Sequence, residues 1–386
     1  MMNIKLYNKI SSKGLNLFDD QYHVDVDIDK PDAILVRSAK LHDIELNDEL
    51  KAIARAGAGV NNILIDKCSE KGIVVFNTPG ANANAVKELV LAGMLLSSRP
   101  IYNAMQWLNT VKDDENIADL AEKEKSKFTG CELQGKSLGV IGLGAIGLNV
   151  ANMALHLGMD VYGYDPYLSI ESAWQLSRRV KLVKSIEEVY KHSDYITIHV
   201  PMNDSTKNMI DKNAIKLMKN GVIVLNYARG GLVNENDMIE ALESNKVHKY
   251  VSDFASSKMM NQKDFICTPH LGASTPEAEE NCAVMAVHQL MDYLENGNIK
   301  NSVNLPNVSM ERSGEIRITC FHLNAPNMLA QISQAISKAN LNIENMINKS
   351  KKEYAYTIVD VDHADIDDVV ENLKCIPSML RVQVYK

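Results

Sequence analysis

The chain has 386 residues, of which 46% are hydrophobic and 23% are charged, so it is long enough for two or three domains and has the composition of a globular protein. Its formal net charge of −8 argues against nonspecific binding of nucleic acids, which requires clustered lysine and arginine. The first residues, MMNIKLYNKI, do not resemble a signal peptide, and no later apolar run approaches about 18 residues, so we expect a cytoplasmic protein that does not enter a membrane.

The first part of the chain alternates between strand-like and helix-like runs. The apolar runs DAILVRS (residues 32–38) and GIVVFN (72–77) predict strands, whereas DELKAIARAG (48–57) and ANAVKELVLAGMLLSSR (83–99) predict helices. This alternation is typical of a parallel sheet, and we expect one α/β unit over the first 97 or so residues.

A second α/β series follows a polar, charged segment at residues 111–130. It is expected to form a second doubly wound parallel sheet and to end in a helix over residues 276–297. Its strand-like runs are SLGVI, VYGYD, YITIHVP, GVIVLNYAR and YVSDF.

The last part of the chain follows a linker at residues 298–314, which contains Pro306 and Gly314. Residues 316–386 show the order strand, helix, strand, strand, helix, strand, which is typical of a ferredoxin-like module. The predicted fold class is therefore α/β, with two Rossmann-like doubly wound parallel-sheet domains and a C-terminal ferredoxin-like domain.

The six cysteines are scattered and include no C-x-x-C pair. This spacing favours reduced thiols that fill the core over disulfides or a zinc site, and we expect no metal. They are Cys68, Cys131, Cys267, Cys282, Cys320 and Cys375.

A G-x-G-x-x-G motif, formed by Gly142, Gly144 and Gly147, lies between an apolar strand and a helical run. Glycines at these positions permit a tight turn and a close approach of a pyrophosphate to the N–H groups at the helix start. Asp165 ends the next strand, where a carboxylate can accept the ribose hydroxyls and repel a 2′-phosphate. The motif therefore predicts NAD rather than NADP as cofactor, against the alternative of a glycine-rich turn with a surface aspartate.

Arg229 and His270 follow two further strands of the second series, in NYARGG and TPHLGAST. Ligands of open α/β sheets bind at the carboxyl ends of the strands. Each residue alone is more typical of a structural or surface role, but together with a nicotinamide they suit the oxidation of a 2-hydroxy acid. Arginine would fix the carboxylate, and neutral histidine would take the hydroxyl proton.

The chain resembles the D-2-hydroxyacid dehydrogenase family through GLGAIG, Asp165, HVP, NYARGG and TPHLGASTPEA, from Lys5 to about Pro306. The resemblance implies a substrate-binding domain of residues 1–97 and 284–312, an NAD-binding Rossmann domain of residues 98–283, and a regulatory domain of residues 315–386. The loops LVRSAK, RAGAGVNNI and NTPGANANAVKELV are similar to those of members that oxidise D-3-phosphoglycerate.

The resemblance also implies roles for individual residues. Arg37 and Ser38 would bind a substrate phosphate, with added charge from Lys40, and Asn82 would line the substrate pocket. The N–H groups of Ala58 and Gly59 would meet the substrate carboxylate. The implied cofactor contacts are Gly142, Gly144, Ala145, Ile146, Gly147, Asp165, His199, Val200, Pro201, Tyr227, Ala228, Asp253 and Gly272, with Asp253 at the nicotinamide.

One position departs from the family pattern. The family usually has a glutamate after the Asp253 position that orients the catalytic histidine, but the segment DFASSKMMNQKDFICTPH contains none. Asp264, Lys258 or a water molecule are the open alternatives for the partner of His270.

The C-terminal module resembles the ACT domain through FHLNAPNMLAQI, NLNIENM and MLRVQVY. The resemblance implies a serine effector site at His322, Asn324 and Asn342, against the alternative that the module only dimerises. Asn327 occupies the usual place of a glycine, and asparagine tolerates a positive φ there.

The family implies a homodimer or homotetramer and a small-molecule substrate. Two alternatives to D-3-phosphoglycerate oxidation are open: another D-2-hydroxyacid dehydrogenase, of the 2-hydroxyglutarate or glyoxylate type, and a non-catalytic NAD-sensing regulator with the same fold.

Overall fold

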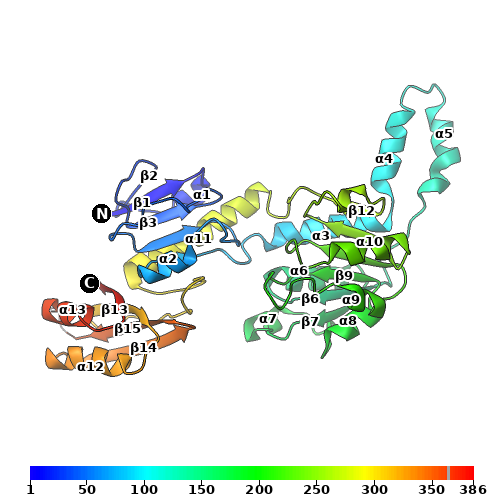
Figure 1. The fold of residues 1–386 in the computed structure, drawn as a ribbon. Coiled ribbons are helices and arrows are strands. Elements are labelled where there is room, and N and C mark those ends of the chain that lie inside the picture. The colour runs from blue at the N-terminus through cyan, green and yellow to red at the C-terminus, as the bar shows by residue number, and fades with distance from the viewer. Residues whose placement is uncertain (363–365) are drawn as a thin grey trace. The chain divides into compact units, whose positions relative to one another are not determined.

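The computed structural model describes residues 1–362 and 366–386 (Figure 1). The chain divides into two compact units, of which the first contains Met1–Asn82 and Pro276–Lys386 and the second contains Ala83–Thr275. The division differs from the predicted domain boundaries at residues 83–97, which join the second unit, and at residues 276–283, which join the first unit. The C-terminal module, predicted as a separate domain, belongs to the first unit. The three predicted domains stay a proposal.

The first unit begins with a five-stranded sheet in the order β2-β1-β3-β4-β5, in which every pairing is parallel. Its elements are β1 (Met2–Tyr7), α1 (Ser12–Leu15), β2 (Tyr22–Asp25), β3 (Ala33–Val36), β4 (Ala52–Arg55), α2 (Ile65–Glu70) and β5 (Val74–Phe76). The predicted parallel sheet is confirmed.

The prediction of a helix at residues 48–57 is wrong, because this segment contains β4. Ala52, Ile53 and Ala54 are fully buried, and β4 pairs with a strand on each side. A strand buried on both faces is a continuous apolar run, and so short a run has no periodicity that separates it from a helix.

A helix was predicted for residues 276–297 at the end of the second series, and α11 (Pro276–Asn296) confirms the helix but covers one face of the first unit's sheet along its length. Its buried residues include Ala283, Ala286, Val287 and Leu290, which recur at the spacing of one helix face and join the core of the sheet. A Cβ at Gly14 of α1 would lie 2.8 Å from the Ala283 side chain, so glycine lets α1 approach α11 closely.

The C-terminal module is an antiparallel sheet in the order β14-β15-β13-β16 with two helices. Its elements are β13 (Ile316–Leu323), α12 (Met328–Lys338), β14 (Ile343–Lys351), β15 (Tyr354–Val361), α13 (Asp367–Lys374) and β16 (Met379–Tyr385). Asn327 has a φ of 69°, so the asparagine keeps the turn before α12. The predicted ferredoxin-like order is confirmed.

The two faces of this C-terminal sheet pack against different partners. One face packs on α12 and α13, and α12 lies on the side away from α11 (Figure 1). From the other face Phe321 and Tyr356 join the core of the first sheet together with Phe76 and Tyr293. The Tyr356 hydroxyl donates to the carbonyl of Gly297 at 2.8 Å. The module is therefore part of the first unit's continuous core.

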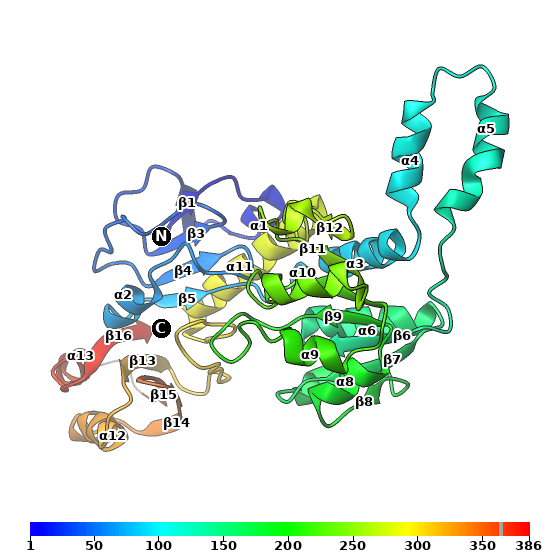
Figure 2. The same cartoon turned by 45° about the vertical axis from the view of Figure 1, so that its right-hand side comes forward.

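The second unit has a seven-stranded, fully parallel sheet in the order β12-β11-β10-β9-β6-β7-β8 (Figure 2). Its strands are β6 (Ser137–Ile141), β7 (Asp160–Tyr164), β8 (Lys181–Leu182), β9 (Tyr195–Ile198), β10 (Val222–Asn226), β11 (Val247–Ser252) and β12 (Phe265–Cys267). Its α-helices on the sheet are α3 (Ala83–Ser98), α6 (Ala145–His156), α7 (Ile170–Gln175), α8 (Ile186–His192), α9 (Lys212–Leu217) and α10 (Glu235–Glu243), and short 3₁₀ turns are η1 (Lys125–Phe128) and η2 (Met259–Asn261). This doubly wound sheet confirms the second predicted series.

Two helices, α4 (Ile101–Thr110) and α5 (Ile117–Glu124), stand away from the sheet of the second unit (Figure 2). Neither contains a buried residue, and Tyr102 and Met105 of α4 are exposed. The polar segment seen in the sequence thus contains a helix, which its charge did not indicate.

Three of the cysteines, Cys68, Cys282 and Cys320, are buried as predicted, whereas Cys131 and Cys375 are exposed. Within the described ranges, the helices are all too short or too polar to cross a lipid bilayer.

Candidate active site

Six of the predicted site residues lie at one edge of the second unit's sheet. Because all seven strands are parallel, the residues that follow their carboxyl ends share that edge. Gly142, Asp165, His199, Arg229, Asp253 and His270 follow β6, β7, β9, β10, β11 and β12, respectively.

The glycine motif forms the turn between β6 and α6. Gly142 has a φ of 90°, and a Cβ there would lie 2.6 Å from the carbonyl oxygen of His199. A Cβ at Gly147 would lie 1.9 Å from the Gly142 oxygen, whereas a Cβ at Gly144 would meet nothing within 4 Å. Gly142 and Gly147 are thus required by packing, and Gly144 leaves open space above the first N–H groups of α6, at Ala145 and Ile146.

Asp165 ties the end of β7 to this turn. One carboxylate oxygen accepts the N–H of Leu143 at 2.8 Å, and the other accepts the N–H of Tyr167 at 2.8 Å. Each oxygen keeps a lone pair, so the half-buried carboxylate can still accept hydroxyl groups of a ligand.

His199 begins the loop after β9, which continues through Val200 and Pro201. Its Nε2 lies 2.9 Å from the Thr197 hydroxyl, whereas Nδ1 is buried and has no hydrogen-bond partner among residues 1–362 and 366–386. Burial lowers the pKa of His199 to about 3, so the ring is neutral at physiological pH. This unpartnered nitrogen beside the glycine turn is consistent with a bound cofactor that supplies the missing partner.

Tyr227 and Ala228 begin the loop after β10 and place Arg229 at the surface. Tyr227 is buried, and both its burial and nearby Asp253 raise the pKa of its hydroxyl. The Arg229 guanidinium is exposed and donates one hydrogen bond, from Nη1 to the Ala228 carbonyl at 2.7 Å. Its remaining N–H groups have no partner in the described part of the chain, so they are available for a carboxylate.

The carboxylate of Asp253 holds the loop that carries His270. It is 2% exposed and accepts hydrogen bonds from the Thr268 hydroxyl at 2.6 Å and from the N–H groups of Leu271 and Gly272 at 2.8 Å each. The predicted contact of Asp253 with nicotinamide stays a prediction, because its observed partners are all protein groups.

His270 itself has a φ of 56°, in the left-handed region that few residues other than glycine adopt. Its N–H donates to the carbonyl oxygens of Asp253 at 3.1 Å and Thr268 at 3.0 Å. The exposed imidazole packs against the Phe254 ring, with 5.1 Å between ring centroids. Its nitrogens have no hydrogen-bond partner in the part of the chain that the structure describes.

Two of the three alternatives for the partner of His270 are engaged elsewhere. Asp264 forms an ion pair with Lys249 at 2.5 Å. The Lys258 ammonium lies 3.4 Å from the Asn236 side-chain oxygen. No carboxylate therefore orients the imidazole within the described residues, and a water molecule is the alternative that stays open.

The predicted substrate residues follow strands of the first unit. Ala58 and Gly59 follow β4, and their carbonyl oxygens accept from Asn77 at 2.6 Å and from the Arg55 guanidinium, respectively. Within the described ranges, the N–H groups of Ala58 and Gly59 donate to no protein acceptor, which leaves them for a ligand. The side-chain oxygen of Asn82 is buried without a partner there as well.

Arg37 and Ser38 follow β3, and Lys40 is exposed near them. The Arg37 guanidinium forms an ion pair of 2.6 Å with Glu279, and both side chains are about 40% exposed. Glu279 therefore offsets part of the positive charge that was predicted to bind phosphate.

Arg55 is a candidate site residue that the sequence reading did not identify. Its Nε donates to the Arg37 carbonyl at 2.9 Å, so it links the loops after β3 and β4. Residues at the carboxyl end of a parallel strand are candidates for a binding site. Because residues 48–57 were predicted as a helix, Arg55 was not recognised as such a residue.

The three predicted effector residues are not brought together within one C-terminal module. His322 and Asn324 lie at the end of β13, whereas Asn342 precedes β14, which starts at the opposite end of the sheet. The His322 ring is buried, with Nε2 2.9 Å from the Thr357 hydroxyl and Nδ1 2.8 Å from the Leu323 carbonyl oxygen. Burial lowers the pKa of His322, and this effect outweighs the hydrogen bonds with the Leu323 backbone and the Asn348 side chain, which raise the pKa.

Comparisons with known proteins show to which family and fold the chain is similar. Residues 91–272 match the family model of the D-isomer specific 2-hydroxyacid dehydrogenase, NAD binding domain. Over 280 residues the chain is 38% identical to the D-3-phosphoglycerate dehydrogenase of Methanocaldococcus jannaschii, across 71% of this chain but 51% of that relative. The chain thus spans about half the length of this relative.

Two further similarities cover more of the other protein. The chain is 33% identical over 353 residues to the D-3-phosphoglycerate dehydrogenase of Haemophilus influenzae, across 88% of this chain and 82% of that one. The structure of the NAD+-bound 3-phosphoglycerate dehydrogenase of Entamoeba histolytica matches with a TM-score of 0.60 and 28% identity, across 78% of this chain and 98% of that one.

The low pKa of His199 predicts a pH dependence of stability. Below about pH 6.5 an unfolded histidine binds a proton, but folded His199 stays neutral down to about pH 3. The free energy of unfolding should therefore decrease as the pH falls below about 6.5, by roughly 2 kcal/mol at about pH 5 from this residue alone. His199→Gln should remove that part of the decrease, as measured by chemical denaturation of both proteins across this range. Parallel pH profiles for the two proteins would contradict the burial argument.

Proposed function

The chain belongs to the D-isomer specific 2-hydroxyacid dehydrogenase family, and on this premise we propose that it oxidises D-3-phosphoglycerate to 3-phosphooxypyruvate with NAD, the first step of serine biosynthesis. The observation that carries the proposal is the placement of Arg229 and His270, both with unengaged side-chain groups, at the same sheet edge as the glycine turn. The names of the relatives from Methanocaldococcus jannaschii and Haemophilus influenzae support this choice of substrate.

The residues around the glycine turn fit NAD. Gly144 leaves room for the pyrophosphate above α6, Asp165 keeps lone pairs for the ribose hydroxyls, and the unpartnered His199 nitrogen lies beside them. The Asp165 charge would repel the 2′-phosphate of NADP. Bound NAD supplies the hydride acceptor.

The chain's own residues supply binding and proton transfer. The Arg229 guanidinium donates to the substrate carboxylate, which fixes C2 and its hydroxyl relative to His270. The neutral imidazole of His270 accepts the hydroxyl proton as the hydride leaves C2, and in reduction the protonated ring returns it. The N–H groups of Ala58 and Gly59 are proposed to bind the substrate carboxylate. Arg37 and Ser38 are proposed to bind its phosphate, and Asn82 is proposed to line the pocket.

One observation favours a second candidate function. The ion pair of Arg37 with Glu279 reduces the affinity expected for a phosphate, which would suit an unphosphorylated 2-oxo acid such as 2-oxoglutarate or glyoxylate. A non-catalytic NAD-sensing regulator is less well supported, because Arg229 and His270 both keep side-chain N–H or ring nitrogen groups that have no protein partner among the described residues.

Serine is proposed to act through the C-terminal module, in a homodimer or homotetramer in the cytoplasm. Because Asn342 lies at the opposite end of the sheet from His322 and Asn324, a site with all three residues requires a second copy of the module. The exposed edge strand β14 offers the backbone groups for an antiparallel pairing that would supply it. The apolar exposed side chains of α4 offer a further contact between copies.

Cofactor binding is tested by two glycine variants that differ in their packing. A methyl group at Gly144 meets no protein atom within 4 Å, so Gly144→Ala should keep the thermal stability but weaken NADH binding at least about tenfold. Gly147→Ala places a methyl group 1.9 Å from the Gly142 oxygen and should lower the midpoint of thermal unfolding by several degrees. Calorimetric titration with NADH and thermal denaturation measure the two effects, and wild-type NADH affinity in Gly144→Ala would contradict the cofactor site.

Substrate identity is tested by following NADH oxidation with 3-phosphooxypyruvate, 2-oxoglutarate and glyoxylate, each with and without L-serine. We expect the highest kcat/KM with 3-phosphooxypyruvate and inhibition by serine. Preference for either unphosphorylated acid would support the second candidate function, and no turnover of any of the three would support the regulator.

Two variants of the Arg37 ion pair serve as matched controls for that assay. Arg37→Ala should raise the KM for 3-phosphooxypyruvate about tenfold or more and change that for glyoxylate little. Glu279→Gln frees the guanidinium and should lower the KM for 3-phosphooxypyruvate. Equal effects on both substrates would show that Arg37 does not bind the phosphate.

A further inference from the structure

A cavity of about 720 Å³ lies in the first unit, along α11 and the segment that follows it. The face of α11 that lines it, with Val284, Met285 and Asp292, is not the face that packs on the sheet. The segment after α11 contributes Asn298 and Lys300. None of the residues assigned to the substrate, cofactor or effector lines this cavity, and its volume is in the range of sites for small organic ligands.

The cavity presents two opposite charges whose polar atoms are not fully paired. One carboxylate oxygen of Asp292 accepts the side-chain amides of Asn296 at 3.2 Å and Asn298 at 3.0 Å. The second oxygen has no donor, and the Lys300 ammonium has no acceptor, among the residues that the structure describes. One free anion and one free cation in one cavity favour a ligand that carries both charges.

Gln289 adds an uncharged acceptor to the cavity wall. The residue is 6% exposed, and its side-chain amide nitrogen donates to the carbonyl oxygens of Asn77 at 3.2 Å and Met285 at 3.0 Å. These two bonds fix the orientation of the amide, so its oxygen is the buried atom that has no donor in the described part of the chain. Buried acceptors without a donor are rare in folded proteins, and a ligand N–H group that reached this oxygen would satisfy it.

We propose that this cavity binds a free α-amino acid with an apolar side chain. The ammonium group donates to the free oxygen of Asp292 and to Gln289, and the carboxylate accepts from Lys300. The side chain of the ligand packs on Val284 and Met285, which are half-buried. The volume exceeds what a small amino acid fills, which is why leucine, methionine and phenylalanine are the appropriate probes.

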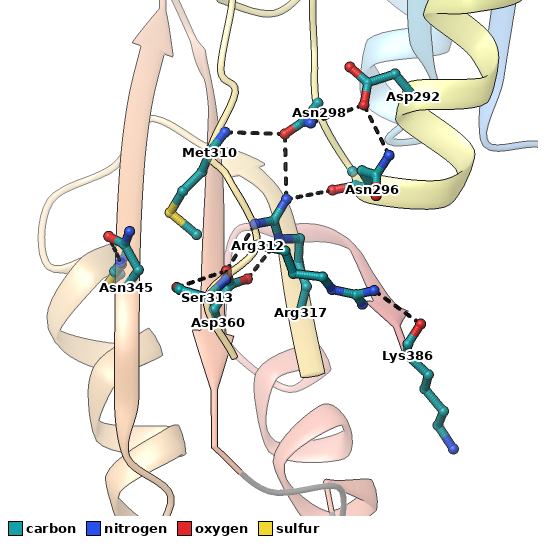
Figure 3. A network of polar contacts seen from close by, with 12 residues as sticks. Asp292, Asn296, Asn298, Met310, Arg312, Ser313, Arg317, Asn345, Asp360 and Lys386 are labelled. Carbon is teal, nitrogen blue, oxygen red and sulfur yellow. Dashed lines mark hydrogen bonds and ion pairs between the residues drawn. The ribbon is translucent and has the colours of Figure 1, made fainter. Parts of the chain in front are cut away.

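The same asparagines that hold Asp292 also anchor the C-terminal module (Figure 3). The side-chain oxygen of Asn298 accepts from the N–H of Met310 at 3.2 Å and from Arg317 of β13 at 3.5 Å, and Arg317 donates to the Asn296 carbonyl at 3.0 Å. Arg317 is fully buried and forms a two-pronged ion pair with Asp360 of β15, at 2.7 and 2.9 Å. An amino acid bound at Asp292 thus touches the network that joins the module to α11.

The test is calorimetric titration of the full chain with L-leucine, L-methionine and L-phenylalanine. Two analogues of leucine each lack one charge: isoamylamine lacks the carboxylate, and 4-methylpentanoate lacks the ammonium group. We expect at least one of the three amino acids to bind. If leucine binds, each of its two analogues should bind at least about tenfold more weakly than leucine.

Three variants locate the binding. Asp292→Asn keeps an oxygen for the two asparagine amides and should fold normally, yet weaken binding at least about tenfold, and Lys300→Met should do the same. Lys300→Arg keeps the positive charge and should bind nearly as the wild type does. Asn324→Ala, in the predicted effector loop, should leave the affinity unchanged.

The proposal is overturned if none of the three amino acids binds. It is equally overturned if 4-methylpentanoate binds as tightly as leucine, or if Asp292→Asn and Lys300→Met bind as the wild type does while their thermal unfolding is unaltered. Loss of binding in Asn324→Ala alone would assign the amino acid to the C-terminal module instead.

Discussion

The carboxylate of Asp253 is the constraint on which the candidate active site depends. Buried at the end of β11, it accepts three hydrogen bonds from the loop that follows β12. Hydrogen bonds to an ionised acceptor are stronger than those between neutral groups, and here they hold His270 in the left-handed conformation. The N–H of Asp253 also donates to the Asn226 carbonyl at 3.2 Å, and the Asn226 amide donates to the Arg229 carbonyl at 2.9 Å. The loops of both proposed catalytic residues are therefore tied to one short stretch of neighbouring strands.

This arrangement explains how His270 is held in place without the glutamate that usually orients the catalytic histidine in this family. A carboxylate that bonds the imidazole normally fixes the ring and its tautomer. Here the ring nitrogens have no such partner in the described part of the chain, and Asp264 is paired with Lys249. The position of His270 is set by the backbone, through Asp253, and by packing of its ring on Phe254. In the proposed mechanism, proton transfer by His270 therefore depends on the rigidity of its loop more than on a second carboxylate.

Much of the fold and part of the site could be predicted from the sequence. The glycine motif between an apolar strand and a helix carries its own geometry, and parallel strands place the residues after them at a common edge. The prediction of the segment type was wrong at β4, where three consecutive buried residues show no periodicity, and Arg55 at its end was missed with it. The role of Asp253 as the anchor of residues 268–272 could not be predicted, because its partners lie 15 or more residues further along the chain. The cavity on α11 was hidden for the same reason, since it combines residues 80–81 with residues 281–301.

We propose that the three hydrogen bonds accepted by Asp253 hold the imidazole of His270 in position for proton transfer, and a double-mutant cycle tests this dependence. Asparagine at position 253 cannot accept all three hydrogen bonds, because one of its two terminal atoms is a donor. With 3-phosphooxypyruvate and NADH, Asp253→Asn should lower kcat by about 100-fold, and His270→Gln should have little further effect in that background. A wild-type kcat in Asp253→Asn would contradict this dependence, and so would losses in the two single variants that multiply in the double variant.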